Sequence, residues 1–272
     1  MSPAGDANAD NRVAIITGAA RGIGALTARR LASSGWRLVL VDRCEDDPDL
    51  SYSLATPGDL KATVAACGGP DQAEGVIADV RDQAALNGAT QLALDRFGGL
   101  DAALAIAGCI GGGVYAWKTP DPLWSTLIAV NLEGAWRLAK ATVPALLMRP
   151  EPRQGRFVAV SSASGTVGIY MLAAYSAAKH GVIGLIRSLA AELGPFGVTA
   201  NAVAPGSTAT AMLDASTALY GLADRSEFAS QHLLPRLLLP DEPAALIAWL
   251  CGPDSSGITG AVLPVDAGMT AR

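Results

Sequence analysis

The fold is decided by the stretch Val13-Ala14-Ile15-Ile16-Thr17-Gly18-Ala19-Ala20-Arg21-Gly22-Ile23-Gly24. Its first four residues form a continuous apolar run, which is typical of a parallel strand that is buried on both faces. A glycine-rich turn follows, and then a helix with Ile23, Leu26 and Leu31 on one side. Glycines let the main chain approach a pyrophosphate, and the start of a helix offers free N–H groups. We therefore expect a nucleotide-binding strand–turn–helix unit.

The next strand supports this interpretation and indicates which nucleotide binds. Residues 38–41 form a second apolar run, and Asp42 closes it 18 residues after Gly24. An acid at this place can accept hydrogen bonds from both ribose hydroxyls of NAD, and it would repel the 2′-phosphate of NADP. The glycines are spaced as Gly-x-x-x-Gly-x-Gly, which departs from the usual Gly-x-Gly-x-x-Gly. The unit as a whole predicts binding of NAD.

Length and composition limit the other possibilities. A chain of 272 residues with half of them hydrophobic suits one large α/β domain or two small ones. The net charge of -5 and the scattered basic residues argue against a nucleic-acid surface. No apolar run reaches about 18 residues, and the first ten residues are polar, so we expect no membrane span and no signal peptide. Residues 1–11 are predicted to be a disordered tail and 12–272 a single cytoplasmic domain.

Cysteines and histidines offer no further chemistry. The four cysteines are widely spaced without a CxxC pair, which favours free thiols in a reducing compartment. No cluster of histidine, cysteine and carboxylate residues has metal-ligand spacing, so no metal site is predicted. His180 follows Lys179 on an expected helix, and His232 lies in a segment that looks mobile. We interpret both histidines as structural or surface residues.

A second stretch, residues 162–179, carries candidate catalytic groups. Tyr175 and Lys179 are four residues apart in an Ala-rich run, so a helix would place them on one face. A fixed ammonium next to a phenol favours the phenolate, which predicts a pKa of Tyr175 below its usual value of about 10. Such a tyrosine can exchange a proton with an alcohol or a carbonyl. Because Tyr-x-x-x-Lys also occurs by chance, the rest of the chain has to decide.

Several motifs together resemble the short-chain dehydrogenase/reductase family of the compact single-domain type. The resemblance covers about residues 12–269. It implies an α/β fold: a single-domain Rossmann fold with a seven-stranded, mostly parallel sheet and helices on both faces. The motifs, in the family's order, are Thr17-Gly-x-x-x-Gly-Ile-Gly24, Asn131, Ser162, Tyr175-x-x-x-Lys179 and Pro205-Gly206.

The resemblance implies a role for each candidate catalytic residue. Tyr175 would be the general base in oxidation, and Lys179 would lower its pKa and bind the nicotinamide ribose. Ser162 would hold the substrate oxygen; it is preferred to Ser161 because it precedes Tyr175 by thirteen residues, the family's usual separation. Asn131 would hold a water that links the lysine to solvent. The alternative for Asn131 is an ordinary helix asparagine that is paired with the backbone.

The resemblance also implies a set of NAD contacts along the ends of the strands. The family usually has two asparagines where this chain has Ala105 and Ile106, so other hydrogen bonds or water must anchor that strand end. The implied contacts are Gly18, Arg21, Gly22, Ile23, Gly24, Asp42, Arg43, Asp79, Val80, Ala107, Gly108, Tyr175, Lys179, Pro205, Gly206, Thr208 and Thr210.

The connection after Asp42 is longer than is usual in the family. Its sequence is similar to a carveol dehydrogenase-like subgroup, in which Asp-x-Cys ends the second strand and Ala-Thr-Pro-x-Asp-Leu ends the loop, as in residues 55–60. That subgroup is associated with mycofactocin, a peptide-derived redox cofactor. The resemblance therefore implies tightly held NAD with mycofactocin as electron acceptor. Two alternatives remain open: a plain surface insertion with freely exchanging NAD, and a non-catalytic nucleotide-sensing protein.

The segment 207–239 falls where the family carries its substrate lid. It is rich in leucine and alanine, which favours an apolar alcohol or ketone as substrate. The alternative is a packed helix pair that meets no substrate. The resemblance further implies a homotetramer, formed by the helix of Asn131 and the helix of Tyr175 and Lys179.

Overall fold

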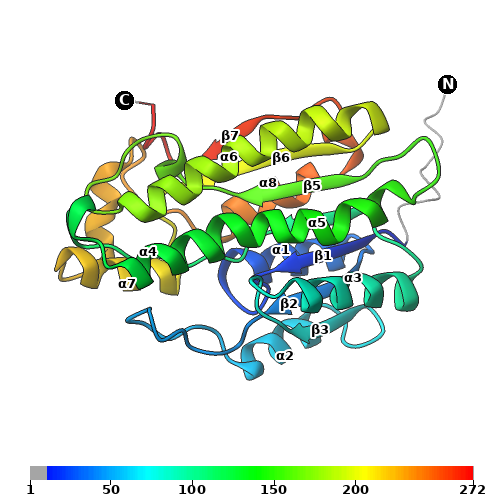
Figure 1. Ribbon diagram of the computed structural model, residues 1–272, viewed down its shortest axis with the longest axis horizontal. Coiled ribbons are helices and arrows are strands. Elements are labelled where there is room, and N and C mark those ends of the chain that lie inside the picture. The colour runs from blue at the N-terminus through cyan, green and yellow to red at the C-terminus, as the bar shows by residue number, and fades with distance from the viewer. Residues whose placement is uncertain (1–10, 272) are drawn as a thin grey trace.

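The computed structural model describes residues 11–271. A single parallel sheet forms the middle layer, and helices cover both of its faces (Figure 1). Helices α1, α2 and α8 pack on one face, and α3, α5 and α6 pack on the other. The predicted disordered tail lies outside the described residues except for Asn11. Within residues 11–271 no helix is long and apolar enough to cross a membrane.

The sheet has seven strands, and every neighbouring pair is parallel. The strand order is β3-β2-β1-β4-β5-β6-β7, so the direction of winding reverses between β1 and β4. In open parallel sheets the crevice at such a reversal, beyond the carboxyl ends of the strands, is where ligands bind. The strands are β1 Val13–Thr17, β2 Arg37–Asp42, β3 Ala73–Ile77, β4 Ala102–Ala105, β5 Arg156–Val160, β6 Thr199–Pro205 and β7 Val262–Val265.

Strand β1 shows why the apolar runs form central strands. All five of its residues are buried. Val13 and Ile15 join the core on one side of the sheet, whereas Ala14 and Ile16 join the core on the other side. Successive side chains of a strand point to opposite faces, so a strand between two helix layers has to be apolar throughout.

The helix of Asn131 is interrupted in the structure. Asn131 lies in a π-helical turn, Ala129–Glu133, which separates α4 from α5. The helices are α1 Gly22–Ser33, α2 Pro57–Ala66, α3 Gln83–Phe97, α4 Asp121–Ile128, α5 Gly134–Leu147, α6 Ala173–Leu193, α7 Ala211–Tyr220 and α8 Asp241–Leu250.

The start of α2 fixes the far end of the long loop after β2. The Thr56 hydroxyl accepts the Asp59 N–H at 3.2 Å, and the Asp59 carboxylate accepts the Thr56 N–H at 2.8 Å. This reciprocal arrangement is a capping box, and it satisfies two N–H groups that the helix itself leaves without partners. The loop is therefore held at both ends, by β2 and by α2.

Candidate active site

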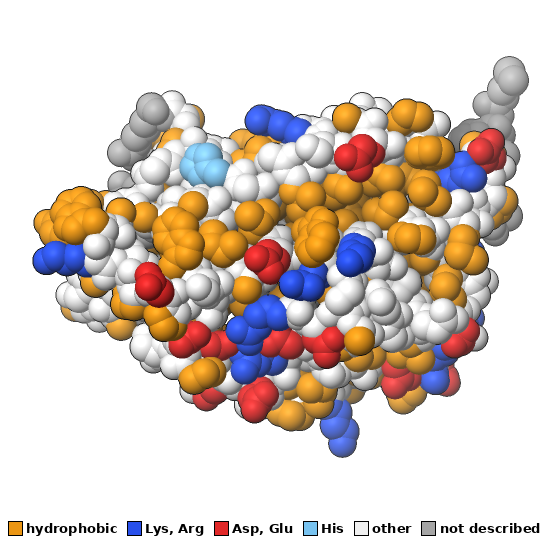
Figure 2. Space-filling view, viewed as in Figure 1, with side chains coloured by type: hydrophobic (Ala, Val, Ile, Leu, Met, Phe, Trp, Pro, Cys, Tyr) orange, Lys and Arg blue, Asp and Glu red, His pale blue; other side chains and the backbone are white. Residues whose placement is uncertain are grey.

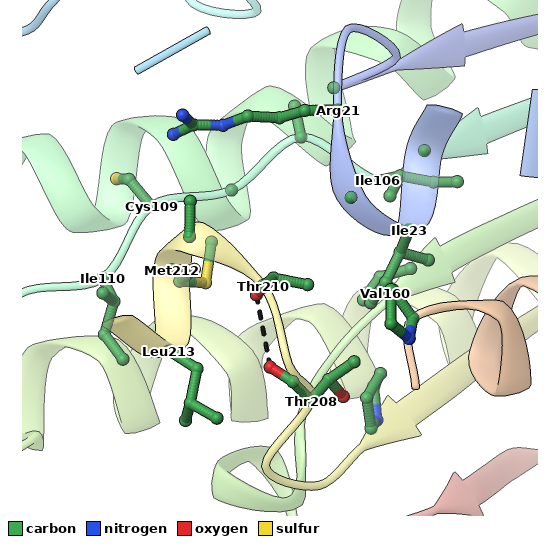
Figure 3. A pocket seen from close by; sticks show the side chains of 18 of the residues that line it. Arg21, Ile23, Ile106, Cys109, Ile110, Val160, Thr208, Thr210, Met212 and Leu213 are labelled. Atoms are coloured by element: carbon green, nitrogen blue, oxygen red, sulfur yellow. Dashed lines mark hydrogen bonds between the residues drawn. The ribbon is translucent and has the colours of Figure 1, made fainter. Parts of the chain in front are cut away.

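A cavity of about 700 Å³ opens beyond the carboxyl ends of the strands, across the reversal between β1 and β4 (Figure 3). Every residue that was predicted to contact NAD lines this cavity, and so does Ser162. Asn131 does not line it. The sequence motifs, which are spread over almost two hundred residues, therefore meet at one place.

The glycine turn brings α1 against the central strands. Gly18 has a φ of +69°, and a Cβ there would lie 2.7 Å from the Cα of Ala107. At Gly24 a Cβ would overlap with the carbonyl oxygen of Gly18. Only glycine fits at either residue, because both backbones are in direct contact with another segment. The free N–H groups at the start of α1 consequently face the cavity.

Thr17 anchors the end of β4, where the family's two asparagines are missing. Its hydroxyl donates to the Leu104 carbonyl at 3.3 Å. The same oxygen accepts the N–H groups of Ile106 at 3.2 Å and Ala107 at 3.3 Å. One threonine side chain from β1 thus supplies the hydrogen bonds that the sequence analysis required from another source.

The two adjacent serines after β5 have different partners. The Ser161 hydroxyl is buried and donates to the Lys179 carbonyl at 2.9 Å. The Ser162 hydroxyl lines the cavity and accepts the Ser164 N–H at 3.1 Å. Because that bond uses only a lone pair of Ser162, its hydrogen can be donated to another oxygen, and the oxygen that it meets in this structure is that of Tyr175. This geometry agrees with the preference for Ser162 over Ser161.

The protonation of Tyr175 and Lys179 differs from the prediction. Burial raises the pKa of Tyr175 to about 12, and its hydrogen bond with Ser162 acts in the opposite direction. Burial lowers the pKa of Lys179 to about 8. The lysine ammonium donates to the Val160 carbonyl at 2.9 Å and lies 5.7 Å from the centre of the Tyr175 ring. The expected lowering of the Tyr175 pKa by the protein's own groups is therefore wrong, because desolvation outweighs the hydrogen bond from Ser162.

Asn131 is bound to the main chain. Its amide nitrogen donates to the carbonyls of Cys109 and Leu127, both at 2.9 Å, and its oxygen accepts the Cys109 N–H at 3.2 Å. A Cβ at Gly108 would lie 2.8 Å from the Asn131 oxygen and 3.4 Å from the Lys179 nitrogen. The glycine backbone thus passes between the two side chains. The pairing with backbone is the one observed, and the water-holding role stays a prediction.

The adenosine end of the cavity is lined by Asp42. One carboxylate oxygen accepts the Ala20 N–H at 3.0 Å, and the other accepts the Cys44 N–H at 3.2 Å. These bonds fix the carboxylate at the end of β2, facing the glycine turn. Each oxygen keeps a further lone pair for a ribose hydroxyl.

Arg43 and Asp79, which were predicted to contact NAD, belong to an ion-pair network beside Asp42. Arg43 pairs with Asp47 and, at 3.5 Å, with Asp79. Arg81 pairs with Asp47 at 2.8 Å and with Asp79 at 2.6 Å. Although burial would raise the pKa of Asp47, the Asp49 N–H and the two arginines hold it below its ordinary value. Because the arginines are neutralised in this way, they offer little to a 2′-phosphate.

The loop of residues 43–56, which we call the strap, crosses the cavity. Arg21 of the glycine turn donates to the Ser53 carbonyl at 2.9 Å. The Tyr52 hydroxyl accepts the Ile110 N–H at 2.9 Å from the loop that follows β4. Burial raises the pKa of Tyr52. The Tyr52 ring packs in one apolar cluster with Tyr175, so the strap reaches the catalytic end of the cavity.

The predicted lid closes the other side with apolar side chains. Met212 and Leu213 of α7 face the cavity, opposite Ile110 (Figure 3). Tyr220 and Phe228 line it as well, and their rings meet edge to face, with centroids 5.9 Å apart. The part of the predicted lid that lines the cavity therefore forms an apolar wall.

The loop between β6 and α7 forms the floor beside Ser162. Pro205, Gly206, Thr208 and Thr210 all line the cavity, as predicted. The Thr208 hydroxyl donates to the Gly206 carbonyl at 2.9 Å, and the Thr210 hydroxyl donates to the Thr208 carbonyl at 3.3 Å (Figure 3). Thr210 lies across the cavity from Gly22, because a Cβ added at Gly22 would be 3.6 Å from the Thr210 methyl carbon.

A family model described as enoyl-(acyl carrier protein) reductase matches residues 18–270. The chain belongs to the short-chain dehydrogenase/reductase family. It is 37% identical to (-)-trans-carveol dehydrogenase of Rhodococcus erythropolis, over 98% of this chain and 100% of that one. It is 38% identical to a putative ketoacyl reductase of the monensin polyketide synthase of Streptomyces virginiae, over 95% and 97% of the two chains.

Solved structures show the same similarity. The carveol dehydrogenase of Mycobacterium avium, in complex with NAD, superposes with a TM-score of 0.90 at 33% identity, over 97% of this chain and 99% of that one. Levodione reductase gives a TM-score of 0.87 at 30% identity, with the same two coverages. The predicted Rossmann fold and the family resemblance are thereby confirmed, and the protein is an oxidoreductase.

Three residues that contribute to the site of this short-chain dehydrogenase carry little signal in the sequence. Tyr52 lies in a polar, irregular loop, where a single aromatic residue was the only available signal. Thr17 was read only as part of the glycine motif. His232 was placed in a mobile-looking segment, but it is 3% exposed and bonded to the floor of the cavity.

Proposed function

We propose that this protein transfers hydride between NAD and an apolar secondary alcohol or its ketone. We further propose that it holds NAD tightly and passes the electrons to mycofactocin. The observation that carries the proposal is the single cavity, in which the glycine turn and Asp42 lie at one end and Ser162 and Tyr175 at the other. An extended dinucleotide matches this arrangement, with its ribose and pyrophosphate on α1 and its reactive ring beside the tyrosine.

The residues present fit NAD. The close contacts of Gly18 and Gly24 leave room for a pyrophosphate at the start of α1, and Asp42 retains lone pairs for the ribose. NAD was also found in the related carveol dehydrogenase structure. When bound, NAD supplies the carbon that accepts hydride and a positive ring charge, which favours ionisation of a neighbouring phenol.

The chain's own residues would handle the proton. As a phenolate, Tyr175 takes the hydroxyl proton of the alcohol in oxidation, and as a phenol it returns that proton in reduction. Ser162, which is hydrogen-bonded to Tyr175 in this structure, turns its hydrogen to the substrate oxygen and stabilises the developing alkoxide. Lys179, held by the Val160 carbonyl, keeps a positive charge beside the ring of Tyr175 and reaches the nicotinamide ribose. Asn131 fixes the Gly108–Cys109 backbone and holds the relay water.

The substrate class follows from the walls of the cavity. Met212, Leu213 and Phe228 offer no hydrogen bonds, so the part of the substrate away from the reacting oxygen should be apolar. The relatives that are named carveol dehydrogenases point to a cyclic terpenoid alcohol as the first compound to test.

Tight retention of NAD is supported by the strap. Its ties to Arg21 and to the Ile110 N–H lie on two sides of the cavity, and Asp49 of the strap accepts the Thr126 hydroxyl of α4 at 2.6 Å. An enclosed dinucleotide could leave only after these bonds break. An electron acceptor other than free NAD would then be required, which is the role given to mycofactocin.

One experiment separates the alternatives. The purified protein is dialysed, its NAD content is measured, and carveol is added with or without an artificial electron acceptor. We expect NAD to remain, to be reduced once by carveol, and to turn over only with the acceptor. Loss of NAD on dialysis and fast turnover with added NAD would establish the exchangeable alternative. Retained NAD that no alcohol reduces would indicate a nucleotide sensor.

We also propose a homotetramer formed through α4, α5 and α6. Hydrophobic side chains gather over the region where Figure 1 draws α5 and α6 (Figure 2). Trp124 of α4 is 42% exposed and Trp136 of α5 is 44% exposed. Large exposed aromatic side chains on one face are typical of a surface that binds another protein.

A further inference from the structure

His232 is a buried residue that no step of the proposed mechanism uses. It directly follows the 3₁₀ helix Arg225–Gln231 of the lid. The imidazole Nε2 lies 3.2 Å from the main-chain nitrogen of Ser207, and Nδ1 lies 2.6 Å from the Arg236 carbonyl oxygen. A main-chain N–H can only donate and a carbonyl can only accept. Nε2 must therefore be the acceptor and Nδ1 must carry the hydrogen.

Ser207 is part of the floor beside Ser162, and the lid's return segment, residues 232–238, binds both of its main-chain groups. His232 takes the Ser207 N–H, and the Leu238 N–H donates to the Ser207 carbonyl at 3.0 Å. On the other side, a Cβ at Gly206 would lie only 2.9 Å from the Cα of Asp266. The floor is thus clamped between the return segment and the end of β7.

The clamp is connected to the body of the domain. Arg236, whose carbonyl receives the His232 hydrogen, pairs through both guanidinium nitrogens with the Glu242 carboxylate of α8, each at 2.7 Å. The same carboxylate accepts the Leu239 N–H at 2.7 Å. Arg236 therefore links α8 to His232, with its side chain bonded to Glu242 and its carbonyl bonded to His232, and His232 in turn holds the floor of the cavity.

We infer that His232 is a positioning residue for hydride transfer: through Ser207 it sets the height of the Gly206–Thr208 floor on which the nicotinamide rests. The inference rests on the proposed function, since it takes the reactive ring of NAD to lie between this floor and Tyr175. Hydride transfer is sensitive to small displacements of the reacting carbons. Without the hydrogen bond between His232 and Ser207, the floor should still bind NAD but should orient the nicotinamide ring less well.

Two amide variants separate the bond of His232 to Ser207 from its bond to Arg236. His232→Asn keeps a donor where Nδ1 stands, so it retains the Arg236 bond and loses the Ser207 bond. His232→Gln places an amide oxygen near Nε2, so it retains the Ser207 bond and loses the Arg236 bond. Each loses one hydrogen bond, so their melting temperatures should fall by similar amounts. A purely structural histidine would make them equal in rate as well.

The readout is the single-turnover reduction of bound NAD by carveol, followed at 340 nm. We expect the rate constant of His232→Asn to fall about tenfold, which corresponds to one hydrogen bond, and that of His232→Gln to stay within about threefold of the wild type. Equal rates in the two variants would overturn the inference. If the wild type reduces no NAD at all, the proposed function fails instead.

Hydrogen exchange gives a second test that needs no variant. With NADH bound, the Ser207 amide of the wild-type protein should exchange at least tenfold more slowly than an unprotected amide, because Nε2 holds it. Unprotected exchange would contradict the clamp even if neither variant folds.

Discussion

Tyr175 does its chemistry in surroundings that oppose ionisation. Burial keeps its pKa at about 12, so the proton leaves only when a positive charge is added beside it. We predict that Tyr175→Phe lowers the single-turnover rate by at least about a hundredfold, the usual contribution of an acid–base group, and leaves NAD bound. Absorbance at 340 nm and NAD content measure the two effects. Activity close to the wild-type value would disprove the assignment.

The buried ammonium of Lys179 should lower the free energy of unfolding at neutral pH. The folded chain releases the lysine proton near pH 8 and the unfolded chain near pH 10.5, so stability rises with pH between these values. We predict that Lys179→Met is more stable than the wild type at pH 7 by about 1 to 3 kcal/mol and is inactive. The advantage should shrink towards pH 10, as urea unfolding at several pH values would reveal. A constant difference would refute the explanation.

The hydroxyl of Thr17 should stabilise the folded protein. Thr17→Val removes the oxygen that accepts the Ile106 and Ala107 N–H groups, and it should cost about 1 to 3 kcal/mol in the free energy of unfolding. Thr17→Ser keeps that oxygen and is the matched control. If both variants lose the same stability, the methyl group rather than the hydroxyl matters.

Residues differ in how far sequence could predict them. Ser162, Tyr175 and Lys179 can be nominated from the sequence because their spacing and order match the family's motifs, and the structure brings all three to one cavity. The partners Thr17, Tyr52 and His232 were missed, since their contacts join segments far apart in the chain. The direction of the Tyr175 pKa was also misjudged, because burial depends on packing that a helical spacing does not show.

At the scale of elements, the strap is the part of this chain that most departs from a plain nucleotide-binding sheet. Tyr52→Phe removes its bond to the Ile110 N–H and keeps the ring. We predict that NADH then leaves about two- to tenfold faster, as stopped-flow fluorescence would show. Tyr115→Phe alters a tyrosine that is 43% exposed and lies outside the cavity lining, so it is the control. An unchanged release rate would show that the Tyr52 hydroxyl does not slow the release of NADH.

The strands and most helices could be predicted because the apolar residues that become buried recur in a regular pattern along the sequence. Strands β1 and β2 are continuous apolar runs, and Thr56 and Pro57 mark the start of α2. The π turn around Asn131 could not be predicted, since it is a single turn within an otherwise helical stretch and no turn residue or cap marks it. The course of the strap could not be predicted either, because a polar loop has no periodicity.

For the whole molecule, the exposed aromatic side chains on α4 and α5 predict assembly. Trp136→Glu would place a charge in the proposed interface, and light scattering should then report a smaller particle than for the wild type. Trp249, which is 41% exposed on α8 in the opposite helix layer, provides the control variant Trp249→Glu. An unchanged mass for Trp136→Glu would place the interface elsewhere.

A dinucleotide beneath the strap would no longer share the redox state of the cell's free pool. Its midpoint potential would be set by how differently the cavity binds the oxidised and reduced forms, with about 30 mV for each tenfold difference in affinity. The floor, the lysine charge and the strap contacts would then tune the driving force of the reaction, as the surroundings of a haem do. The loop after β2 would thus convert a diffusible carrier into a prosthetic group.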